Sequence, residues 1–461
     1  MTFNSFNRKF PAAITYISFC VPFFSIMSLD AYLSIWVFFY YQVMIGIDAF
    51  FILIPFALIR FTLPFLQPLL GSISDRDFPF TRNLGRRFFW ILVMGFQIPI
   101  FFVLLFWVPF SSGMIFIVVF TTLLLLYNIA YSAFLTSYSA LLLNKFRNPK
   151  ERLLIGTVTE FISAIGLVII TIFVPMFISY GDPSSIRFLT IPIAITFAVT
   201  FSLGIFGILE EKELIDTYFS PNLGPKKGFL RDMFKGFAIF KRKNFLVLLF
   251  RWIAFALFNL LFSSGLAYYW DYVLGAPYYL LSVAYMGYYI WLLIALPFSF
   301  LLSWFLGHLK VSIISGFALG VVLLVFFFVA NILMAVILVS IIGFTFGLGM
   351  ASLIPLVGDV FDEHANINRK RSEGVSYGIL KMFGGLTVIL SNVITAFVYS
   401  LTGFISGWSP STPLALVGIR LLISIIPGII IINVMILFVT LYDLKPKKTE
   451  AIRMELKELE I

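Results

Sequence analysis

Long apolar stretches separated by short polar gaps run through the whole chain. A helix that spans a membrane needs about 20 predominantly apolar residues, and twelve stretches reach that length. Several exceed it and can cross a bilayer at a tilt. The pattern therefore predicts twelve spanning helices, over residues 12–42, 47–71, 88–110, 114–143, 153–178, 187–209, 244–272, 277–306, 311–330, 332–358, 374–402 and 412–442.

Basic residues are sorted between the two sides of this predicted bundle. Of the 32 lysines and arginines, 27 fall in the N-terminal segment, in alternate gaps between the stretches, and in the C-terminal tail. The intervening gaps contain only Arg187. Cytoplasmic loops carry the excess of Lys and Arg in membrane proteins. We therefore expect a multi-pass protein of the cell membrane with both termini in the cytoplasm.

One long polar gap divides six helices from six. Residues 210–243 contain Pro221 and Pro225 and end in a basic run, which indicates a cytoplasmic linker with a surface helix over 229–240. Six helices, a linker and six helices is the layout of transporters built from two parallel repeats. The predicted domains are an N-terminal half, a linker, a C-terminal half and a charged, helical cytoplasmic tail, at 1–209, 210–243, 244–442 and 443–461.

Composition excludes several other classes of protein. The chain is 61% hydrophobic and only 12% charged, which is too apolar for a surface that faces water. The net charge of +10 is explained by the loops, so no nucleic-acid partner is expected. Cys20 is the single cysteine, and His308 and His364 are the only histidines. With no phosphate-binding loop, metal-ligand spacing or nucleophile motif, we expect neither an enzyme nor a cofactor.

The gap between the second and third helices carries a motif. Gly71-Ser72-Ile73-Ser74-Asp75-Arg76 is followed by Gly85-Arg86-Arg87. A glycine allows a tight helix end, and Asp75 can cap a helix or pair with the arginines. The alternative interpretation is an ordinary basic loop. The motif resembles the loop 2–3 signature of the major facilitator superfamily, which implies an all-α membrane protein of two six-helix halves.

The gap between the tenth and eleventh helices is more specific. It contains Asp359-Val360-Phe361-Asp362-Glu363 and Arg369-Lys370-Arg371-Ser372-Glu373-Gly374. This loop resembles the glycoside–pentoside–hexuronide cation symporter family, the melibiose-permease-like branch of the superfamily. The aromatic run 268–275 and Glu151-Arg152 are also similar to that family. The resemblance implies a sugar transporter that works by alternating access.

Charged residues of these two loops are candidates for a cytoplasmic gate. The acids can pair with Arg369 to Arg371 and with basic residues of the other half, which would hold the cytoplasmic side shut. The alternative is that the charges are merely solvated. The candidate gate residues are Asp75, Arg76, Arg86, Arg87, Asp359, Asp362, Arg371 and Glu373.

Ionisable residues within the predicted spans are candidates for ion coupling. Asp30 lies past the middle of the first helix, Arg60 lies midway along the second, and Glu160 and Lys381 lie about two turns into the fifth and eleventh. Each charge costs roughly 2.5–3.5 kcal/mol or more at the bilayer centre, so each needs a cavity or a partner. A structural ion pair, such as Arg60 with Asp30, is the alternative. Two further spans carry a cation near one end, where it can extend to the membrane surface: Arg251 and Arg420.

The chain departs from the sodium-using members of the family it resembles. Alignment through the second helix places Leu63, Leu66 and Gln67 where those members have acidic and amide residues. A hard cation needs several oxygen ligands, which two leucines cannot supply. A proton needs only one titratable carboxyl, and Asp30 or Glu160 can provide it. We therefore favour a proton over sodium as the coupling cation.

Residues with hydrogen-bonding groups and aromatic rings are candidates for sugar recognition. Sugars are bound by hydrogen bonds to hydroxyls and by stacking on aromatic rings. Tyr and Trp near span ends can instead belong to the interfacial belt. The candidates are Asn128, Tyr131, Tyr138, Asn259, Tyr269, Trp270 and Asn392.

Taken together, the residues and the resemblance predict a secondary active transporter, a sugar or glycoside:proton symporter. Its expected partners are a small-molecule substrate, a coupling cation and the lipid bilayer. The alternatives are a facilitator or exporter of a lipid-like or drug-like molecule, and a membrane receptor that binds a solute without transporting it. The short tail, with no effector domain, argues against a receptor.

Overall fold

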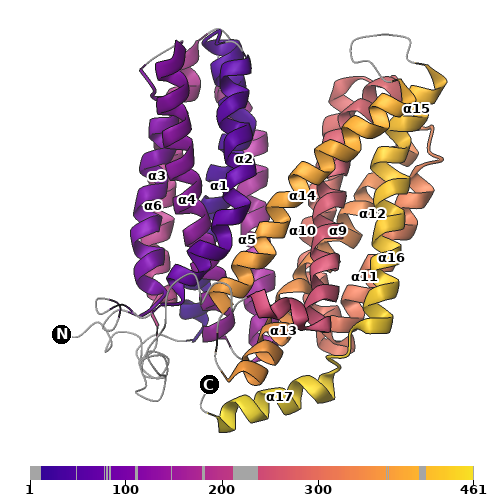
Figure 1. The fold of residues 1–461 in the computed structure, drawn as a ribbon. Helices are drawn as coiled ribbons and strands as arrows, with labels where there is room; N and C mark the ends of the chain where they lie inside the picture. The colour runs from indigo at the N-terminus through magenta and orange to yellow at the C-terminus, as the bar shows by residue number, and fades with distance from the viewer. Residues whose placement is uncertain are drawn as a thin grey trace. The chain divides into compact units, whose positions relative to one another are not determined.

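The regular elements of the chain are all helices in the part that the structure describes (Figure 1). This computed structural model describes residues 12–47, 49–76, 78, 81, 85–109, 113–146, 148–178, 182–210, 237–369, 371, 373–403 and 412–459. Twelve of its helical segments are long and apolar enough to span a membrane. The predicted number of spanning helices is confirmed.

The first six spans are each a single long helix. Short π-helical and 3-10 segments, Tyr40–Met44 and Val174–Phe177, extend the ends of the first and fifth. The six helices are α1 Ala12–Phe39, α2 Ala49–Ser74, α3 Phe88–Phe106, α4 Gly113–Lys145, α5 Pro149–Phe173 and α6 Pro183–Ile208.

The remaining spans are less regular, because breaks and π-helical segments interrupt three of them. Tyr269–Val273 ends the seventh span, Ser352 interrupts the tenth, and Leu421–Ile425 lies within the twelfth. The helices are α9 Lys243–Tyr268, α10 Tyr278–Leu306, α11 His308–Phe326, α12 Ile332–Ala351, α13 Leu353–Asn368, α14 Glu373–Thr402, α15 Pro413–Arg420, α16 Ile426–Leu441 and α17 Pro446–Glu458.

Several helix starts follow one local rule, in which a polar cap precedes a proline. The side chain of Asn148 accepts a hydrogen bond from the backbone of Lys150 at the start of α5. Asp182 and Thr412 cap α6 and α15 in the same way. Proline in the first turn lacks only an N–H that the helix does not use, so cap and proline together fix where these spans begin.

One predicted boundary was wrong. Residues 359–373 were expected to form a loop, but α13 continues the tenth span to Asn368. Asp359 and Asp362 therefore lie on a helix. The helix tolerates these acids because they are buried against cationic and polar side chains on neighbouring elements. The tail was predicted to be helical, and α17 confirms this. The predicted surface helix over 229–240 lies mostly outside the described residues, and Phe237–Lys241 forms a 3-10 turn.

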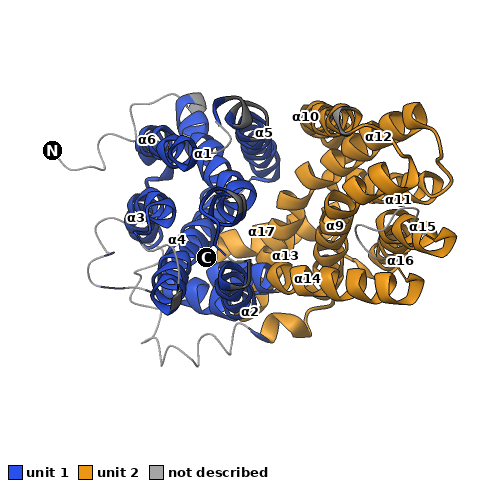
Figure 2. Cartoon of the chain, turned by 90° about the horizontal axis from the view of Figure 1, so that it is seen from above, with its two compact units in different colours: residues 1–237, 370–382, 460–461 blue, residues 238–369, 383–459 orange. Residues whose placement is uncertain are grey.

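The helices group into two compact units (Figure 2). Unit 1 contains residues 1–237 and 370–382, and unit 2 contains 238–369 and 383–459. In unit 1, α1 packs on α6, α3 on α4 and α6, and α2 on α4. In unit 2, α9 packs on α16, α11 on α12 and α16, and α10 on α12. When the spans are numbered within each unit, both units pair the first span with the sixth, the third with the fourth, the third with the sixth and the second with the fourth. This correspondence is expected for two structural repeats.

The division differs from the predicted halves in one respect. The first turns of α14, through Met382, group with unit 1, although the rest of the helix belongs to unit 2. A helix shared in this way carries residues of the eleventh span into the packing of the first unit.

Candidate functional site

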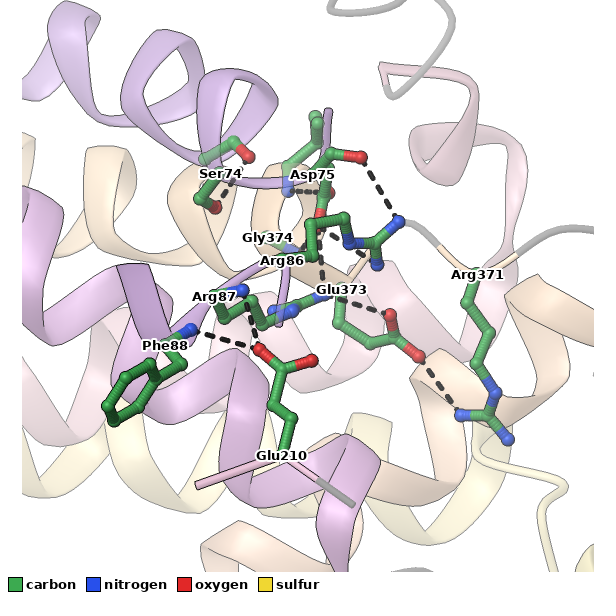
Figure 3. Close-up of polar contacts among 11 residues, drawn as sticks. Ser74, Asp75, Arg86, Arg87, Phe88, Glu210, Arg371, Glu373 and Gly374 are labelled. Atoms are coloured by element: carbon green, nitrogen blue, oxygen red, sulfur yellow. Dashed lines mark hydrogen bonds and ion pairs between the residues drawn. The ribbon is translucent and has the colours of Figure 1, made fainter. Parts of the chain in front are cut away.

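A network of buried charges joins the end of α2, the start of α3 and the start of α14 within unit 1 (Figure 3). Asp75 follows α2, and its carboxylate accepts hydrogen bonds from the backbone N–H groups of Gly374 and Val375, at 3.2 and 2.9 Å. It therefore caps the N-terminus of α14, where the helix dipole favours a negative charge.

Arg87 occupies the middle of this charge network. Its guanidinium Nη2 lies 2.8 Å from the Asp75 carboxylate and 3.3 Å from that of Glu373. Glu373 also accepts a 2.9 Å hydrogen bond from Arg371. The Arg87 side chain is 0% exposed. Removing one partner of a buried ion pair generally costs about 3–5 kcal/mol, because the other charge is left buried without compensation.

Arg86 adds a weaker contact to the same network. Its guanidinium donates to the backbone carbonyl of Asp75 at 3.1 Å and lies 3.9 Å from the Asp75 carboxylate. The predicted pairing of Asp75 with the arginines and of Glu373 with a basic residue of the first six helices is thus present. Arg76 is half-buried beside Asp75.

Glu210 belongs to this region, although sequence reasoning did not select it. It follows α6, is 2% exposed, and accepts hydrogen bonds from the backbone N–H groups of Arg87 and Phe88 at 2.6 and 2.9 Å. It therefore caps the start of α3. The sequence offered one signal for Glu210, which is an acid directly after the last apolar residue of the sixth span. Because Glu210 is also the first residue of a polar linker, this signal did not distinguish it from the other linker charges.

Close backbone packing accompanies the charges. A Cβ on Gly71 would overlap the backbone carbonyl of Gly374, so α2 and α14 approach at glycines. Gly85 adopts a φ of +102°, and the side chain of Glu210 occupies the space where a Cβ would lie. Both positions require glycine for the geometry they have here.

A second polar cluster of unit 1 lies within the spans. Asp30 on α1 and Glu160 on α5 are half-buried, and the ammonium of Lys381 on α14 attracts both carboxylates electrostatically. The ammonium also lies 5.6 Å from the centre of the Tyr377 ring. The structure therefore brings three of the four predicted coupling residues into one electrostatic cluster, which we call the interior cluster.

Aromatic residues of α4 border the interior cluster. Tyr127 and Tyr131 stack with ring centres 6.0 Å apart, and both interact electrostatically with Asp30. The Tyr127 hydroxyl is buried without a hydrogen-bond partner among the described residues. Asn128 lies between them in sequence and donates its amide to the Leu124 carbonyl. Two predicted substrate residues, Asn128 and Tyr131, thus lie on the helix that faces Asp30.

The fourth predicted coupling residue stands apart. Arg60 is exposed on α2, and the described residues place no carboxylate within ion-pair distance of it. The suggested structural pair with Asp30 is therefore not formed in this structure. Further along α2, Leu63, Leu66 and Gln67 are half-buried, and the Gln67 side-chain oxygen has no hydrogen-bond partner in the described part of the chain.

Other predicted substrate residues have packing roles or lie on unit surfaces. The Tyr138 hydroxyl donates to the Phe19 carbonyl, and the Tyr269 hydroxyl donates to the Val329 carbonyl at 2.7 Å. Both side chains, and that of Trp270, are fully buried. Asn259 on α9 and Asn392 on α14 are exposed on unit 2. In this conformation the hydroxyls of both tyrosines are committed to the backbone.

Asp359 and Asp362, the predicted gate residues of the tenth span, contact an arginine that the sequence did not indicate. Asp359 pairs with Arg453 on α17 and with His308 at 2.8 Å, and within the described part of the chain no ion pair joins it to Arg369 or Arg371. Arg453 also lies 3.9 Å from Asp362. A charged face of α13 is therefore covered by the tail helix, which the sequence did not indicate because Asp359 and Arg453 are 94 residues apart.

Further contacts fix the tail on unit 2. Asn244 donates to the carboxylates of Glu363 and Asp443, and Lys448 reaches the same two acids at 3.8 and 2.9 Å. Burial opposes ionisation of Asp443, but the hydrogen bonds from Lys448 and Asn244 hold its pKa below the ordinary value. This contact therefore contributes stability above the ordinary carboxylate range and loses it as the pH falls through the lowered pKa.

Arg251 does not extend to a membrane surface as predicted. It is 0% exposed, donates to the Ser312 hydroxyl at 2.8 Å and to the Gly349 carbonyl at 2.7 Å, and lies 4.5 Å from the centre of the Phe255 ring. Its hydrogen bonds and the aromatic face stabilise a cation inside the unit, which removes the need to reach water.

Comparison with known proteins identifies the family. The family described as MFS/sugar transport protein matches residues 18–445, nearly the whole chain. The chain belongs to this family. It is therefore a secondary transporter of the major facilitator superfamily, a multi-pass membrane protein and not an enzyme. The resemblance to the melibiose-permease-like branch is confirmed. No curated protein matches the chain.

Solved structures share the fold of this family member. A bacterial homologue of the iron transporter ferroportin, in an outward-facing state, aligns with a TM-score of 0.63 and 15% identity, over 91% of this chain and 99% of that chain. The same kind of protein with soaked iron aligns at 0.62 and 16%, over 91% and 98%. At this identity the likeness shows the major facilitator fold alone.

Proposed function

We propose that this transporter is a sugar or glycoside:proton symporter that works by alternating access. The observation that carries the proposal is the interior cluster, in which the ammonium of Lys381 attracts the carboxylates of both Asp30 and Glu160 within the spans. Two carboxylates with one cation leave a net negative charge, which is costly inside a membrane. Binding one proton removes that charge, so the cluster is suited to proton coupling.

The cluster also links protonation to motion. Asp30 and Glu160 lie on α1 and α5, whereas Lys381 lies on α14, the helix whose later residues belong to unit 2. With both carboxylates ionised, Lys381 is held to unit 1. Protonation of either acid weakens that attraction and lets α14 move with unit 2. Alternating access in this superfamily is a rocking of one repeat against the other around a midplane site.

The substrate assignment rests on the aromatic groups beside the cluster and on an amide of the same helix. Tyr127 and Tyr131 offer stacked rings and hydroxyl groups, and Asn128 offers an amide oxygen. This combination suits the apolar faces and hydroxyls of a sugar ring. The family description, a sugar transport protein, supports the same substrate class.

The choice of proton over sodium rests on α2. Leu63 and Leu66 have no oxygen with which to bind a hard cation, and Gln67 supplies only one side-chain oxygen. The carboxylates of Asp30 and Glu160 are already attracted to Lys381. A titratable carboxyl is sufficient for a proton.

We assign the charge network of Asp75, Arg87 and Glu373 to a cytoplasmic gate. The positive-inside rule predicts that both termini and the loop between α2 and α3 lie in the cytoplasm. The network ties the start of α14 to unit 1 by ion pairs and by a helix cap. Opening to the cytoplasm would require these contacts to break.

Replacement of Asp30 by asparagine tests the coupling role. We expect Asp30→Asn to abolish uphill uptake in proteoliposomes while sparing exchange of labelled for unlabelled substrate, since exchange needs no net proton movement. The matched control is Asp182→Asn, the same change at an exposed acid that caps α6, where asparagine also caps well. Intact uphill uptake by Asp30→Asn would exclude Asp30 as the coupling residue and leave Glu160 as the candidate.

A further inference from the structure

Only one of the two carboxylate oxygens of Glu210 accepts hydrogen bonds from the described residues. Oε1 accepts two backbone hydrogen bonds at the start of α3, but Oε2 is buried and has no hydrogen-bond partner among the described residues. A buried polar atom that lacks a partner is costly, and an ionised oxygen more so. Such an atom in a moving protein is expected to find its partner in another state.

The position of Glu210 is fixed from both sides. On α4, the ammonium of Lys145 donates to the carbonyls of Gly207 and Leu209 at 2.6 and 2.9 Å, which holds the end of α6 in place. Gly85 leaves the space that the Glu210 side chain fills. The carboxylate of Glu210 is therefore held at a defined place, with Oε1 at the backbone N–H of Arg87 (Figure 3).

Opening of the gate creates a need for such an acceptor. Glu373 lies at the start of α14, so it leaves Arg87 if that helix moves with unit 2. The guanidinium of Arg87 is fully buried and would lose Glu373, one of the two carboxylates that the contacts among the described residues give it. A buried cation that loses a partner is strongly destabilised unless another acceptor replaces it.

We propose that Glu210 is a positioning residue of the gate, whose Oε2 accepts the Arg87 guanidinium when Glu373 withdraws. In the closed state Glu210 sets the position of Arg87 through the backbone. In the open state it takes over the hydrogen bond that Glu373 releases. This exchange rests on the proposed alternating access, and it makes opening less costly than breaking the ion pair outright.

Replacement of Glu210 by glutamine separates the two roles. The amide oxygen can still accept the backbone hydrogen bonds of Arg87 and Phe88, so α3 remains capped. The amide nitrogen then stands where Oε2 was and cannot accept from Arg87. The variant should therefore keep the closed state and destabilise only the open one.

Opening can be followed with a cysteine at Ser376, which is buried in unit 1 near the start of α14. The reporter is Ser376→Cys in a chain whose only native cysteine is replaced, Cys20→Ser. In proteoliposomes with no added substrate, we expect Glu210→Gln to slow alkylation of the reporter about tenfold, the size expected for a lost hydrogen bond to a charged group. An unchanged or faster rate would overturn the proposal.

Two further variants make the result specific. Glu373→Gln deprives Arg87 of that carboxylate in both states, so Oε2 of Glu210 becomes its acceptor in both, and adding Glu210→Gln should change the alkylation rate less than twofold. A tenfold effect in that background would also overturn the proposal, because Glu210 would then act without the exchange. Asn148→Ala is the matched control, since it removes a helix cap from α5 without touching the gate; we expect it to leave alkylation unchanged.

The assay does not depend on the identity of the substrate. If sugar transport or proton coupling is wrong, alkylation of the parent reporter still reports opening, and the effect of Glu210→Gln stands. If only the exchange is wrong, Asp30→Asn still loses uphill uptake, whereas the Ser376→Cys reporter is alkylated at the same rate with and without Glu210→Gln. The two failures are therefore distinguishable.

Discussion

Arg87 is the residue on which the strongest interactions of unit 1 converge. Its backbone is held by Glu210 from α6, and its side chain is held by Asp75 from α2 and Glu373 from α14. Such a buried cation adds little net stability compared with an apolar side chain of similar size, because desolvation offsets the attraction. Its value lies in specifying which elements come together and in allowing that association to be broken.

Removal of this charge should be costly. We expect Arg87→Gln to lower the free energy of unfolding by about 3–5 kcal/mol, because it leaves Asp75 and Glu373 buried without their common cation. The midpoint of thermal unfolding in detergent measures the effect. We also expect faster alkylation of the Ser376→Cys reporter, because the start of α14 is released.

The matched control is the same substitution at an exposed ion pair. Arg369 pairs with Glu455 at 3.4 Å, and the two side chains are 55% and 49% exposed. Solvent screening limits such pairs to about 0–1 kcal/mol. Arg369→Gln should therefore shift the midpoint little. Equal shifts in the two variants would show that the burial of Arg87 does not govern its contribution.

At the scale of elements, the tail helix completes the surface of α13. Thr449, Ile452 and Leu456 form the buried side of α17, and Arg453 supplies a cation to Asp359 and Asp362. Without α17, the described polar partners of the acids on α13 would be mainly His308 and Asn244. The tail is thus part of the folded unit 2.

Loss of the central cation should release the tail. We expect Arg453→Gln to lower the protection of α17 against hydrogen exchange by more than tenfold, because two buried carboxylates lose their arginine. Lys457→Gln changes an exposed residue of the same helix and should leave protection unchanged. Full protection of α17 in Arg453→Gln would show that the apolar contacts alone hold the tail.

The sequence best predicted those features that depend on residues close together along the chain. Span number follows from the length of apolar stretches, and the contacts of Asp75 with the arginines follow from a glycine-punctuated loop of opposite charges. It was wrong about Asp359 and Asp362, because closely spaced acids suggest a loop unless their partners are known. Arg453 and Glu210 were missed because each acts on a residue more than 90 positions away.

The interior cluster shows the same limit. Asp30, Glu160 and Lys381 were selected one by one, because each is costly in a membrane. Their common location follows from the packing of α1 on α5 and from the grouping of the first turns of α14 with unit 1, which no local pattern encodes. Arg60, selected by the same rule, lies on an exposed surface instead.

At the scale of the whole molecule, the two units differ in where their charges lie. Unit 1 contains the interior cluster and the charge network, whereas the buried acids of unit 2 are gathered at the junction of α13 and α17. The shared helix α14 carries Lys381 in one cluster and Glu373 in the other. The proposed coupling residues and the proposed gate are therefore connected through one helix, so we expect a change in the charge of the interior cluster to bias the gate.

This arrangement predicts which gradient drives transport. We expect proteoliposomes to accumulate a member of a labelled sugar panel when a proton gradient is imposed, and not with a sodium gradient alone. The physical reason is that Asp30 and Glu160 can bind a proton, whereas Leu63 and Leu66 deprive α2 of the oxygen ligands that sodium needs. Accumulation driven by sodium would show that the cation site lies elsewhere. Equilibration without accumulation would favour a facilitator, and no uptake would favour a lipid-like substrate or a non-transporting receptor.

Replacement of Lys381 by glutamine should also abolish proton-driven accumulation. Lys381 is attracted to both acids, so in Lys381→Gln protonation of an acid no longer releases α14.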